Sequence, residues 1–251
     1  MSCVSIRSCR IGEGRPKVIV PIVESTEAAV LQKAAEFSTL RADCVEWRVD
    51  LFAHPMDLSA VAHCLAKLRI ALKEKLLLVT LRTKAEGGSA APDHEAYLRF
   101  LHTVLATDCA DLIDIEFFTA GADLPKLIED AHTAGACVVC SSHDFQKTPP
   151  RAELVARMAA MQRAGADLPK LAVMPQSRTD VLELLAATAE MADRHPETPV
   201  ITMSMGALGA VSRLCGEAFG SAMTFANPGT ASAPGQVSLE VVNAVLDDLK
   251  L

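Results

Sequence analysis

Residues 136–175 read ACVVCSSHDFQKTPPRAELVARMAAMQRAGADLPKLAVMP and contain one complete unit of strand, helix and strand. The apolar run ACVVCS (136–141) predicts a buried strand, AELVARMAAMQ (152–162) has the apolar spacing of a helix, and KLAVMP (170–175) predicts the next strand. Two strands joined by such a helix pair in parallel, with the helix packed against the sheet. This stretch therefore predicts an α/β fold with a parallel sheet.

The same alternation extends along the whole chain. Eight apolar runs begin 23 to 35 residues apart, the length of a strand and its crossover helix. The runs are residues 17–23, 44–49, 76–81, 111–117, 136–141, 170–175, 199–205 and 222–226. Eight such units predict a (β/α)8 TIM barrel as a single domain over residues 1–251, with a short N-terminal hairpin (1–16) across the barrel floor. A doubly wound parallel sheet is the alternative fold.

Composition and charge restrict the class of partner. Half of the 251 residues are apolar, 22% are charged, and the formal net charge is −7. Nucleic acids and anionic membranes require a basic surface, so neither is an expected partner. No apolar run is as long as a signal peptide or a membrane-spanning helix requires, and we therefore expect a cytoplasmic protein.

The cysteines and histidines do not indicate a metal site. Eight cysteines are irregularly spaced, and we expect them to be reduced in the cytoplasm. Cys137 and Cys140 have the spacing of a redox or metal-binding pair, but positions i and i+3 of a strand face opposite sides, so we interpret both as packing residues. The histidines form no H-x-x-x-H or H-x-H pattern, so neither a metal nor a cofactor is expected.

Charged residues occur in strands that a parallel barrel would bury on both faces. Glu46, Arg48 and Asp50 alternate with apolar residues along the second predicted strand. The next four strands carry further charged or titratable residues: Arg82, Asp114, Glu116, His143 and Lys170. An ion pair explains a single buried charge, and we favour this explanation for Asp50 or Asp114 alone. Charges from five successive strands, most of them near carboxyl ends, are instead expected to converge on one cavity.

The heptapeptide GADLPKL occurs twice and contains Lys126 in one copy and Lys170 in the other. The sequence after Lys126 continues with helical period, whereas Lys170 opens the strand KLAVMP. A buried lysine amine beside arginines is expected to lose its proton more easily and to attack a carbonyl carbon. The alternative is a structural ion pair of Lys170 with Glu116 or Asp114. His143 follows a strand and either transfers protons or caps the loop.

Two segments near the C-terminus predict further parts of a site. Gly206 and Gly209 form a turn between a strand and a helix that contains Arg213. This turn is either an anion site at a helix N-terminus or a point of close helix packing. Residues 227–236, NPGTASAPGQ, have the composition of a mobile lid.

Together these motifs resemble the type I 3-dehydroquinate dehydratase family of the shikimate pathway. The likeness lies in EWRVD (46–50), RTKAEGG (82–88), SSHDF (141–145), KLAVMP (170–175), MSMGALGAVSR (203–213) and SAPGQ (232–236). The resemblance implies a lyase that dehydrates 3-dehydroquinate to 3-dehydroshikimate, and it implies a homodimer. One departure is Pro21, which stands where similar proteins often have a serine.

The resemblance also implies a role for each matching residue. Lys170 would form an imine with the substrate ketone, His143 would act as general acid and base, and Glu86 would orient His143. The substrate-binding residues would be Glu46, Arg48, Arg82, Arg213, Ser232 and Gln236. Arg213 would pair with the substrate carboxylate, and Ser232 and Gln236 would close over the substrate from the lid.

Two other functions fit the residues. A class I Schiff-base aldolase acting on a phosphosugar would also use Lys170 and would bind phosphate at the turn between Gly206 and Gly209. A catalytically silent barrel would serve as a binding or scaffold module, but it predicts missing catalytic groups, whereas the sequence retains Lys170, His143 and Glu86.

Overall fold

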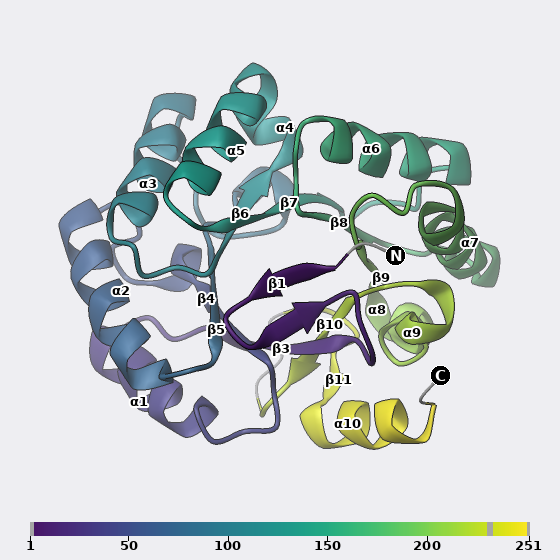
Figure 1. The fold of residues 1–251 in the computed structure, drawn as a ribbon, viewed down its shortest axis with the longest axis horizontal. Coiled ribbons are helices and arrows are strands. Elements are labelled where there is room, and N and C mark those ends of the chain that lie inside the picture. The colour runs from purple at the N-terminus through teal and green to yellow at the C-terminus, as the bar shows by residue number, and fades with distance from the viewer. Residues whose placement is uncertain (1–2, 230–232, 250–251) are drawn as a thin grey trace.

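The computed structural model describes residues 3–229 and 233–249, which form a ring of parallel strands surrounded by helices (Figure 1). The ring contains β3 (Lys17–Ile22), β4 (Cys44–Arg48), β5 (Leu76–Thr80), β6 (Leu112–Glu116), β7 (Cys137–Asp144), β8 (Leu168–Val173), β9 (Ile201–Ser204) and β10 (Met223–Asn227). From β3 to β9 each strand pairs with the next in chain order, and β10 pairs with β3. The predicted (β/α)8 barrel is confirmed, because a doubly wound sheet would not return to its first strand.

The seam of the barrel lies between β9 and β10. Val200 forms a single parallel bridge with Ser221, and the amide of Ala222 donates to the carbonyl of Val200 at 2.8 Å. Beyond this bridge, the short strand β11 (Val237–Ser238) pairs in parallel with the end of β10. Strand β11 is therefore held at the carboxyl end of the barrel.

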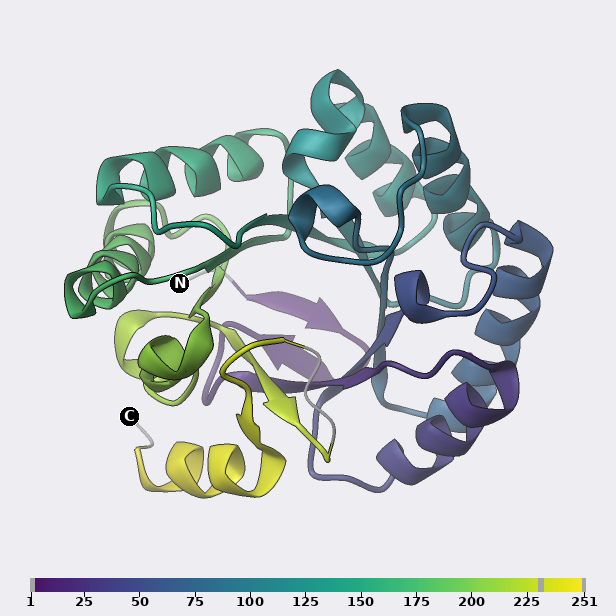
Figure 2. The same cartoon turned by 180° about the vertical axis from the view of Figure 1, so that it is seen from behind.

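Helices cover the outside of the ring on all sides (Figures 1 and 2). The longer ones are α1 (Glu27–Phe37), α2 (Leu58–Leu72), α3 (His94–Ala106), α5 (Leu124–Thr133), α6 (Arg151–Arg163), α7 (Arg178–Arg194) and α10 (Leu239–Asp248). Short turns of helix follow several strands: η1 (Val49–Leu51), η2 (Lys84–Glu86), α4 (Phe117–Ala120), η3 (Gly121–Asp123), α8 (Gly206–Gly209), η4 (Ala210–Arg213) and α9 (Gly216–Phe219). No helix among the described residues is long and apolar enough to cross a membrane.

The inside of the ring changes from apolar to charged along the strands. Near their amino ends, fully buried apolar side chains such as Ile19, Leu76 and Leu112 form an interior cluster. Because inward positions recur at every second residue, the strands then place charged side chains such as Glu46 and Asp114 toward the same interior. The charged side chains therefore form a layer next to the apolar cluster, nearer the carboxyl ends of the strands.

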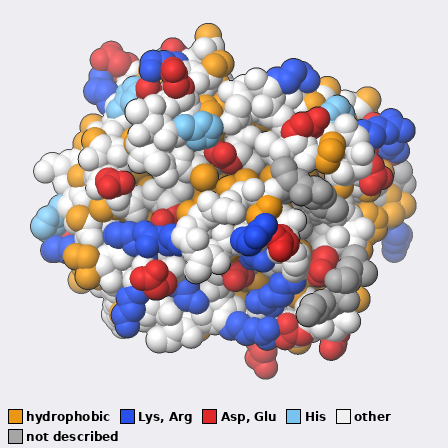
Figure 3. All heavy atoms as spheres, viewed as in Figure 1, with side chains coloured by type: hydrophobic (Ala, Val, Ile, Leu, Met, Phe, Trp, Pro, Cys, Tyr) orange, Lys and Arg blue, Asp and Glu red, His pale blue; other side chains and the backbone are white. Residues whose placement is uncertain are grey.

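The predicted hairpin forms and covers the floor of the barrel. Strands β1 (Val4–Ile6) and β2 (Cys9–Ile11) pair antiparallel and lie in front of the ring in Figure 1. Ile11 is fully buried in the interior apolar cluster, and Nε of Arg7 bonds Oδ1 of Asp111 at 2.6 Å. On this face lysine and arginine side chains lie among aspartate and glutamate side chains (Figure 3).

Two local predictions have different outcomes. Strand β8 begins at Leu168, two residues earlier than predicted, so Lys170 is its third residue and does not open it. Pro169, which has no amide to donate, is the second residue of the strand. Cys137 packs against the interior cluster and Cys140 belongs to the core outside the ring, which confirms that the two face opposite sides.

Candidate active site

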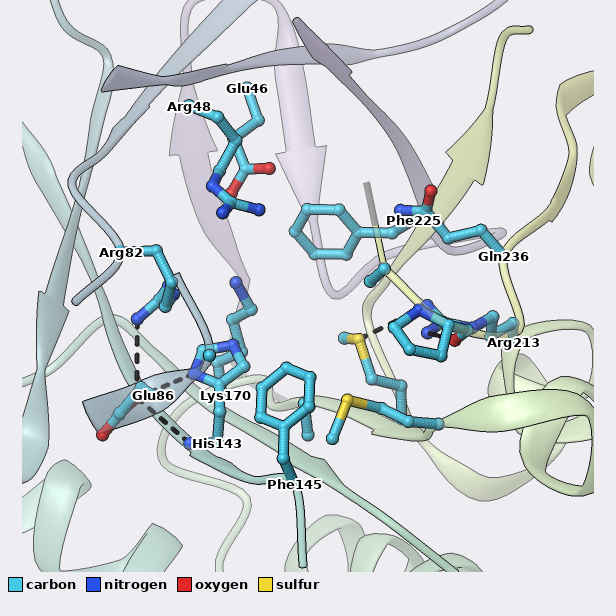
Figure 4. Close-up of a pocket in the computed structure, with 16 residues that line it drawn as sticks. Glu46, Arg48, Arg82, Glu86, His143, Phe145, Lys170, Arg213, Phe225 and Gln236 are labelled. Atoms are coloured by element: carbon cyan, nitrogen blue, oxygen red, sulfur yellow. Dashed lines mark hydrogen bonds and ion pairs between the residues drawn. The ribbon is translucent and has the colours of Figure 1, made fainter. Parts of the chain in front are cut away.

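A cavity of about 130 Å³ lies at the carboxyl ends of the strands, where barrel enzymes have their active sites. It brings together the predicted site residues Glu46, Arg48, Arg82, Glu86, His143, Lys170, Arg213 and Gln236 (Figure 4). Ser232 lies outside the described residues. The barrel thus collects side chains that are up to 190 positions apart in the sequence, from Glu46 to Gln236.

Lys170 extends from β8 into this cavity and is only 4% exposed. Its Nζ atom lies 3.3 Å from Oδ2 of Asp114 on β6 and 4.6 Å from the ring centroid of Phe225 on β10. A carboxylate and an aromatic face both attract an ammonium ion. The ion pair that the sequence offered as an alternative is therefore present, and the same amine also faces the cavity. Lys126 instead lies exposed on α5, as predicted, and pairs with Asp130.

His143 and Glu86 form a tight pair on the adjoining wall. Nδ1 of His143 lies 2.8 Å from Oε2 of Glu86, and the same oxygen accepts the main-chain amide of His143 at 3.1 Å. Glu86 is the last residue of η2 and is 5% exposed, and its other oxygen, Oε1, has no protein hydrogen-bond partner among the described residues. When Glu86 is ionised, it accepts the proton of Nδ1, and Nε2 is then the ring nitrogen that is left for a ligand.

The surroundings of this pair disfavour charge on both members. Burial, together with the cations of Arg82, Lys170 and Arg48, holds the pKa of His143 well below its ordinary value. Burial raises the pKa of Glu86 to about 8, an effect that Arg82 partly offsets. The imidazole is consequently neutral at physiological pH, which is the form that accepts a proton.

Arg82 is the centre of a buried ionic cluster. Its Nη1 atom lies 2.8 Å from Oε1 of Glu116, 2.9 Å from Oγ of Ser141 and 3.5 Å from Oε2 of Glu86. Its Nη2 atom lies 2.7 Å from Oδ2 of Asp114. The guanidinium therefore fixes three carboxylates that come from η2 and β6, and it lines the cavity at the same time.

Glu46 and Arg48 project from β4 toward the cavity. Oε1 of Glu46 accepts the hydroxyl of Thr80 at 2.9 Å. Arg48 donates from Nε and Nη2 to the two oxygens of Asp50 at 2.7 and 2.8 Å. Asp50 lies beyond the strand in η1 and also accepts the amide of Ser89 at 3.0 Å. These contacts support the structural role that the sequence favoured for Asp50.

Arg213 is a buried cation that forms no salt bridge among the described residues. It is the last residue of η4 and is 1% exposed. Its Nη2 atom donates to the carbonyl of Pro234 at 3.2 Å, and Nη1 lies 3.5 Å from Sδ of Met203. Nε has no hydrogen-bond partner in the described part of the chain. Burial alone lowers its pKa to about 10. A buried cation without a counter-ion is costly, and a bound anion would remove that cost.

The turn before Arg213 is closely packed. A Cβ atom on Gly209 would lie 2.4 Å from the main chain of Ser204, so only glycine fits at this position. The amide of Gly206 donates to the carbonyl of Pro234 at 3.2 Å. Of the two interpretations of this turn, these contacts support close packing, since the first amide of the turn is already bonded to protein.

The described part of the predicted lid lies against the cavity. Ala233, Pro234 and Gln236 contribute to its lining, and the carbonyl of Pro234 accepts from both Gly206 and Arg213. Gln236 and Arg213 lie on the same side of the cavity (Figure 4).

Sequence reasoning missed the apolar wall of the cavity. Phe145, Met203, Met205 and Phe225 line it together with the charged groups. Met203 and Phe225 occupy inward positions on β9 and β10, so strand alternation was a signal that could have identified them. Phe145 belongs to the SSHDF motif, and its ring packs directly on Gly87, where an added Cβ would lie 2.2 Å from it.

The fold and the cavity define a (β/α)8 barrel with a buried lysine and a histidine–carboxylate pair at the carboxyl end of its strands. The sequence profile of the type I 3-dehydroquinase family matches residues 18–251, and the chain belongs to this family. A 3-dehydroquinate dehydratase from Bacillus subtilis is 45% identical over 249 residues, which cover 99% of this chain and 98% of that protein. A 3-dehydroquinate dehydratase from Clostridium kluyveri is 45% identical over 98% of this chain and 96% of that protein.

Solved structures agree with this assignment. The type I 3-dehydroquinate dehydratase of Clostridium difficile, solved with covalently modified comenic acid, is 42% identical and superposes with a TM-score of 0.96. That alignment covers 99% of this chain and 98% of the other. The 3-dehydroquinate dehydratase of Enterococcus faecalis is 42% identical, with a TM-score of 0.93 over 99% of this chain and all of the other.

Proposed function

We propose that this chain is a lyase that dehydrates 3-dehydroquinate to 3-dehydroshikimate through an imine on Lys170. One observation carries the proposal: a single cavity is lined by a buried amine, a neutral imidazole and a buried arginine that has no salt bridge among the described residues. These three groups match a ketone, an acidic C–H bond and a carboxylate, which the substrate carries on one ring. The membership of the family supports the same substrate.

In the proposed reaction, Nζ of Lys170 attacks the ketone carbon, and water leaves as the iminium forms. The iminium withdraws electrons from the neighbouring carbon, so its C–H bond becomes acidic enough for a histidine. Nε2 of His143 takes this proton and returns it to the departing hydroxyl group. Glu86 supports both steps because its bond to Nδ1 fixes the plane of the imidazole.

Binding of the substrate would use the two ends of the cavity. We propose that Arg213 pairs with the carboxylate and that Gln236 and Ser232 close over it from the segment 227–236. Glu46, Arg48 and Arg82 line the opposite wall and would contact the ring hydroxyls. A carboxylate bonded to a buried guanidinium is held more strongly than in water, because little solvent competes.

The aldolase alternative receives less support. It needs a phosphate site at the turn before Arg213, but the amide of Gly206 is bonded to Pro234, and a side chain at Gly209 would collide with Ser204. The silent-barrel alternative predicts a disrupted site, whereas Lys170, His143 and Glu86 line one cavity.

The test is incubation of the purified chain with 3-dehydroquinate, followed by the ultraviolet absorbance of the conjugated enone product. Sodium borohydride added with substrate is expected to leave a reduced adduct on Lys170, which peptide mass analysis would locate. His143→Ala is expected to retain this adduct and to lose turnover. An active chain with an unmodified Lys170, or full activity in the histidine variant, would contradict the mechanism.

The expectation of a cytoplasmic homodimer belongs to the same proposal. The surface of the chain exposes the large apolar side chains of Leu182, Ile70 and Val211, which a partner subunit could cover. Light scattering coupled to size-exclusion chromatography would measure the mass in solution. A monomer at micromolar concentration would contradict the expected dimer and would leave the catalytic proposal unaffected.

A further inference from the structure

Asp114 has no role in the reaction as described so far, yet it touches the reacting nitrogen. It lies on the inner face of β6 and is 2% exposed. Oδ2 receives Nη2 of Arg82 at 2.7 Å and Nζ of Lys170 at 3.3 Å. Oδ1 accepts the hydroxyl of Ser141 at 2.6 Å. Both carboxylate oxygens are therefore held by donors.

These donors keep the carboxylate ionised. Burial by itself would raise the pKa of Asp114, but the cations of Arg82 and Lys170 and the hydroxyl of Ser141 outweigh it and lower the pKa. A carboxyl group of this kind is a poor proton acceptor. The neutral imidazole of His143 is the better acceptor in the same cavity, so Asp114 is left with a purely electrostatic task.

We propose that Asp114 is a catalytic residue that serves as the fixed counter-ion of the Lys170 nitrogen, both as an ammonium ion and as the iminium formed with substrate. This inference rests on the proposed imine chemistry. The net step converts an ammonium ion and a ketone into an iminium and water: a C=N bond forms, the C=O bond breaks, and two ammonium protons leave with the oxygen. One positive charge stands on the same nitrogen before and after, so one immobile carboxylate neutralises both states.

The shared contact with Arg82 moderates this effect. A carboxylate that paired with the iminium alone would hold its positive charge strongly and weaken its pull on the neighbouring C–H bond. Because Oδ2 of Asp114 also binds Arg82, part of its charge is already compensated. Asp114 therefore stabilises the iminium without removing its ability to accept electrons.

Glu116 provides a matched comparison on the same strand. It is equally buried and binds the same guanidinium at 2.8 Å. Its other bonds go to Thr83 and Thr119, and no bond joins it to Lys170 among the described residues. Glu116→Gln thus removes a carboxylate from the ionic cluster without removing one from the lysine.

The experiment measures two properties of the full-length chain at pH 7. The first is the rate at which acetic anhydride acylates Lys170 without substrate. The second is the amount of adduct that borohydride traps with 3-dehydroquinate in a fixed short time. For Asp114→Asn we expect acylation to rise at least about tenfold, because Nζ of Lys170 loses its ion pair with Oδ2. We expect trapping to fall at least about tenfold, because the iminium loses its counter-ion.

A rise in acylation together with a fall in trapping distinguishes a counter-ion from a structural residue. A disturbed cavity would lower both the acylation rate and the amount of trapped adduct. Glu116→Gln is expected to change neither acylation nor trapping by as much as Asp114→Asn.

If Asp114→Asn does not fold, Ser141→Ala tests the same point with the carboxylate retained, and we expect smaller changes of the same signs. Unchanged acylation, or parallel losses in a folded Asp114→Asn variant, would overturn the proposal. A wild-type chain that forms no adduct would instead contradict the proposed function, and the acylation rates would still test the ion pair.

Discussion

Oε2 of Glu86 accepts two bonds from one residue, the ring Nδ1 of His143 at 2.8 Å and its main-chain amide at 3.1 Å. The carboxylate thereby fixes both the backbone and the imidazole of the proposed proton carrier. Its own position comes from η2, the turn that follows β5, whereas His143 is near the end of β7. The pair exists only because the barrel places the turn after β5 next to the carboxyl end of β7.

This pair predicts how activity depends on pH. Below about pH 8 Glu86 holds a proton, which can bond Nδ1 and leave the ring proton on Nε2, where it blocks base catalysis. Above that pH the carboxylate accepts Nδ1–H and Nε2 is free. We expect kcat/KM to rise between pH 6.5 and 8.5 at about tenfold per unit at most, and Glu86→Gln to flatten the rise. A wild-type profile without this ascending limb would refute the assignment.

Lys170 and Lys126 permit a test within one repeated heptapeptide. Lys170→Ala is expected to lose activity on the order of 10³-fold or more, because it removes the nucleophile, and to lose the borohydride adduct. Lys126→Ala is the control, since its amine is exposed and pairs with carboxylates of its own helix, and it should keep both activity and adduct. Steady-state rates and adduct masses are measured for both. An adduct that persists in Lys170→Ala would exclude the proposed nucleophile.

Replacing Arg213 is expected to weaken substrate binding without lowering the stability of the fold. Arg213→Met removes a buried cation that has no salt bridge among the described residues, so the melting temperature is expected to stay the same or rise. The lost charged hydrogen bonds to a substrate carboxylate are worth about 1.5 to 3 kcal/mol, or roughly a 10- to 150-fold increase in KM. Arg194→Met, which changes an exposed arginine of α7, is the control. An unchanged KM in Arg213→Met would show that the carboxylate binds elsewhere.

Replacing Gly87 by alanine is expected to cause a steric clash. The same replacement at Gly121 serves as a control for backbone strain alone. Gly87 has a φ of +80°, and a Cβ there would lie 2.2 Å from the ring of Phe145. Gly121 also has a positive φ, +55°, but a Cβ there meets nothing within 4 Å. Both alanine variants should lose about 1 kcal/mol of unfolding free energy from strain. Only Gly87→Ala should also displace Phe145 or the neighbouring Glu86.

The consequence is measurable as a difference between the two variants. We expect kcat/KM to fall at least about tenfold in Gly87→Ala, because a shift of about 1 Å at a catalytic group has large effects. Gly121→Ala should retain the wild-type value. Equal activities of the two variants would mean that the contact between Gly87 and Phe145 does not position the site.

Much of the fold was predictable because it depends on local patterns. Apolar runs at the spacing of strand and helix identified all eight strands of the ring, and the hairpin at the N-terminus also forms as expected. The start of β8 was placed two residues late, because Pro169 lacks an amide and resembles a strand boundary. The inward charges on β4 and β6 were visible from the sequence, since a charge among buried apolar residues requires a partner or a ligand.

The sequence by itself determined that this chain forms a parallel barrel, which of two identical heptapeptides carries the buried lysine, and which titratable residues meet at the carboxyl ends of the strands. Only the tertiary structure decided how those residues pair. In the folded chain Lys170 pairs with Asp114, Glu86 pairs with His143, and Arg82 pairs with three carboxylates. Arg213 has no salt bridge among the described residues. The physical reason is that alternation along a strand fixes which side a residue faces, whereas pairing depends on distances across the ring, between strands that are far apart in the chain.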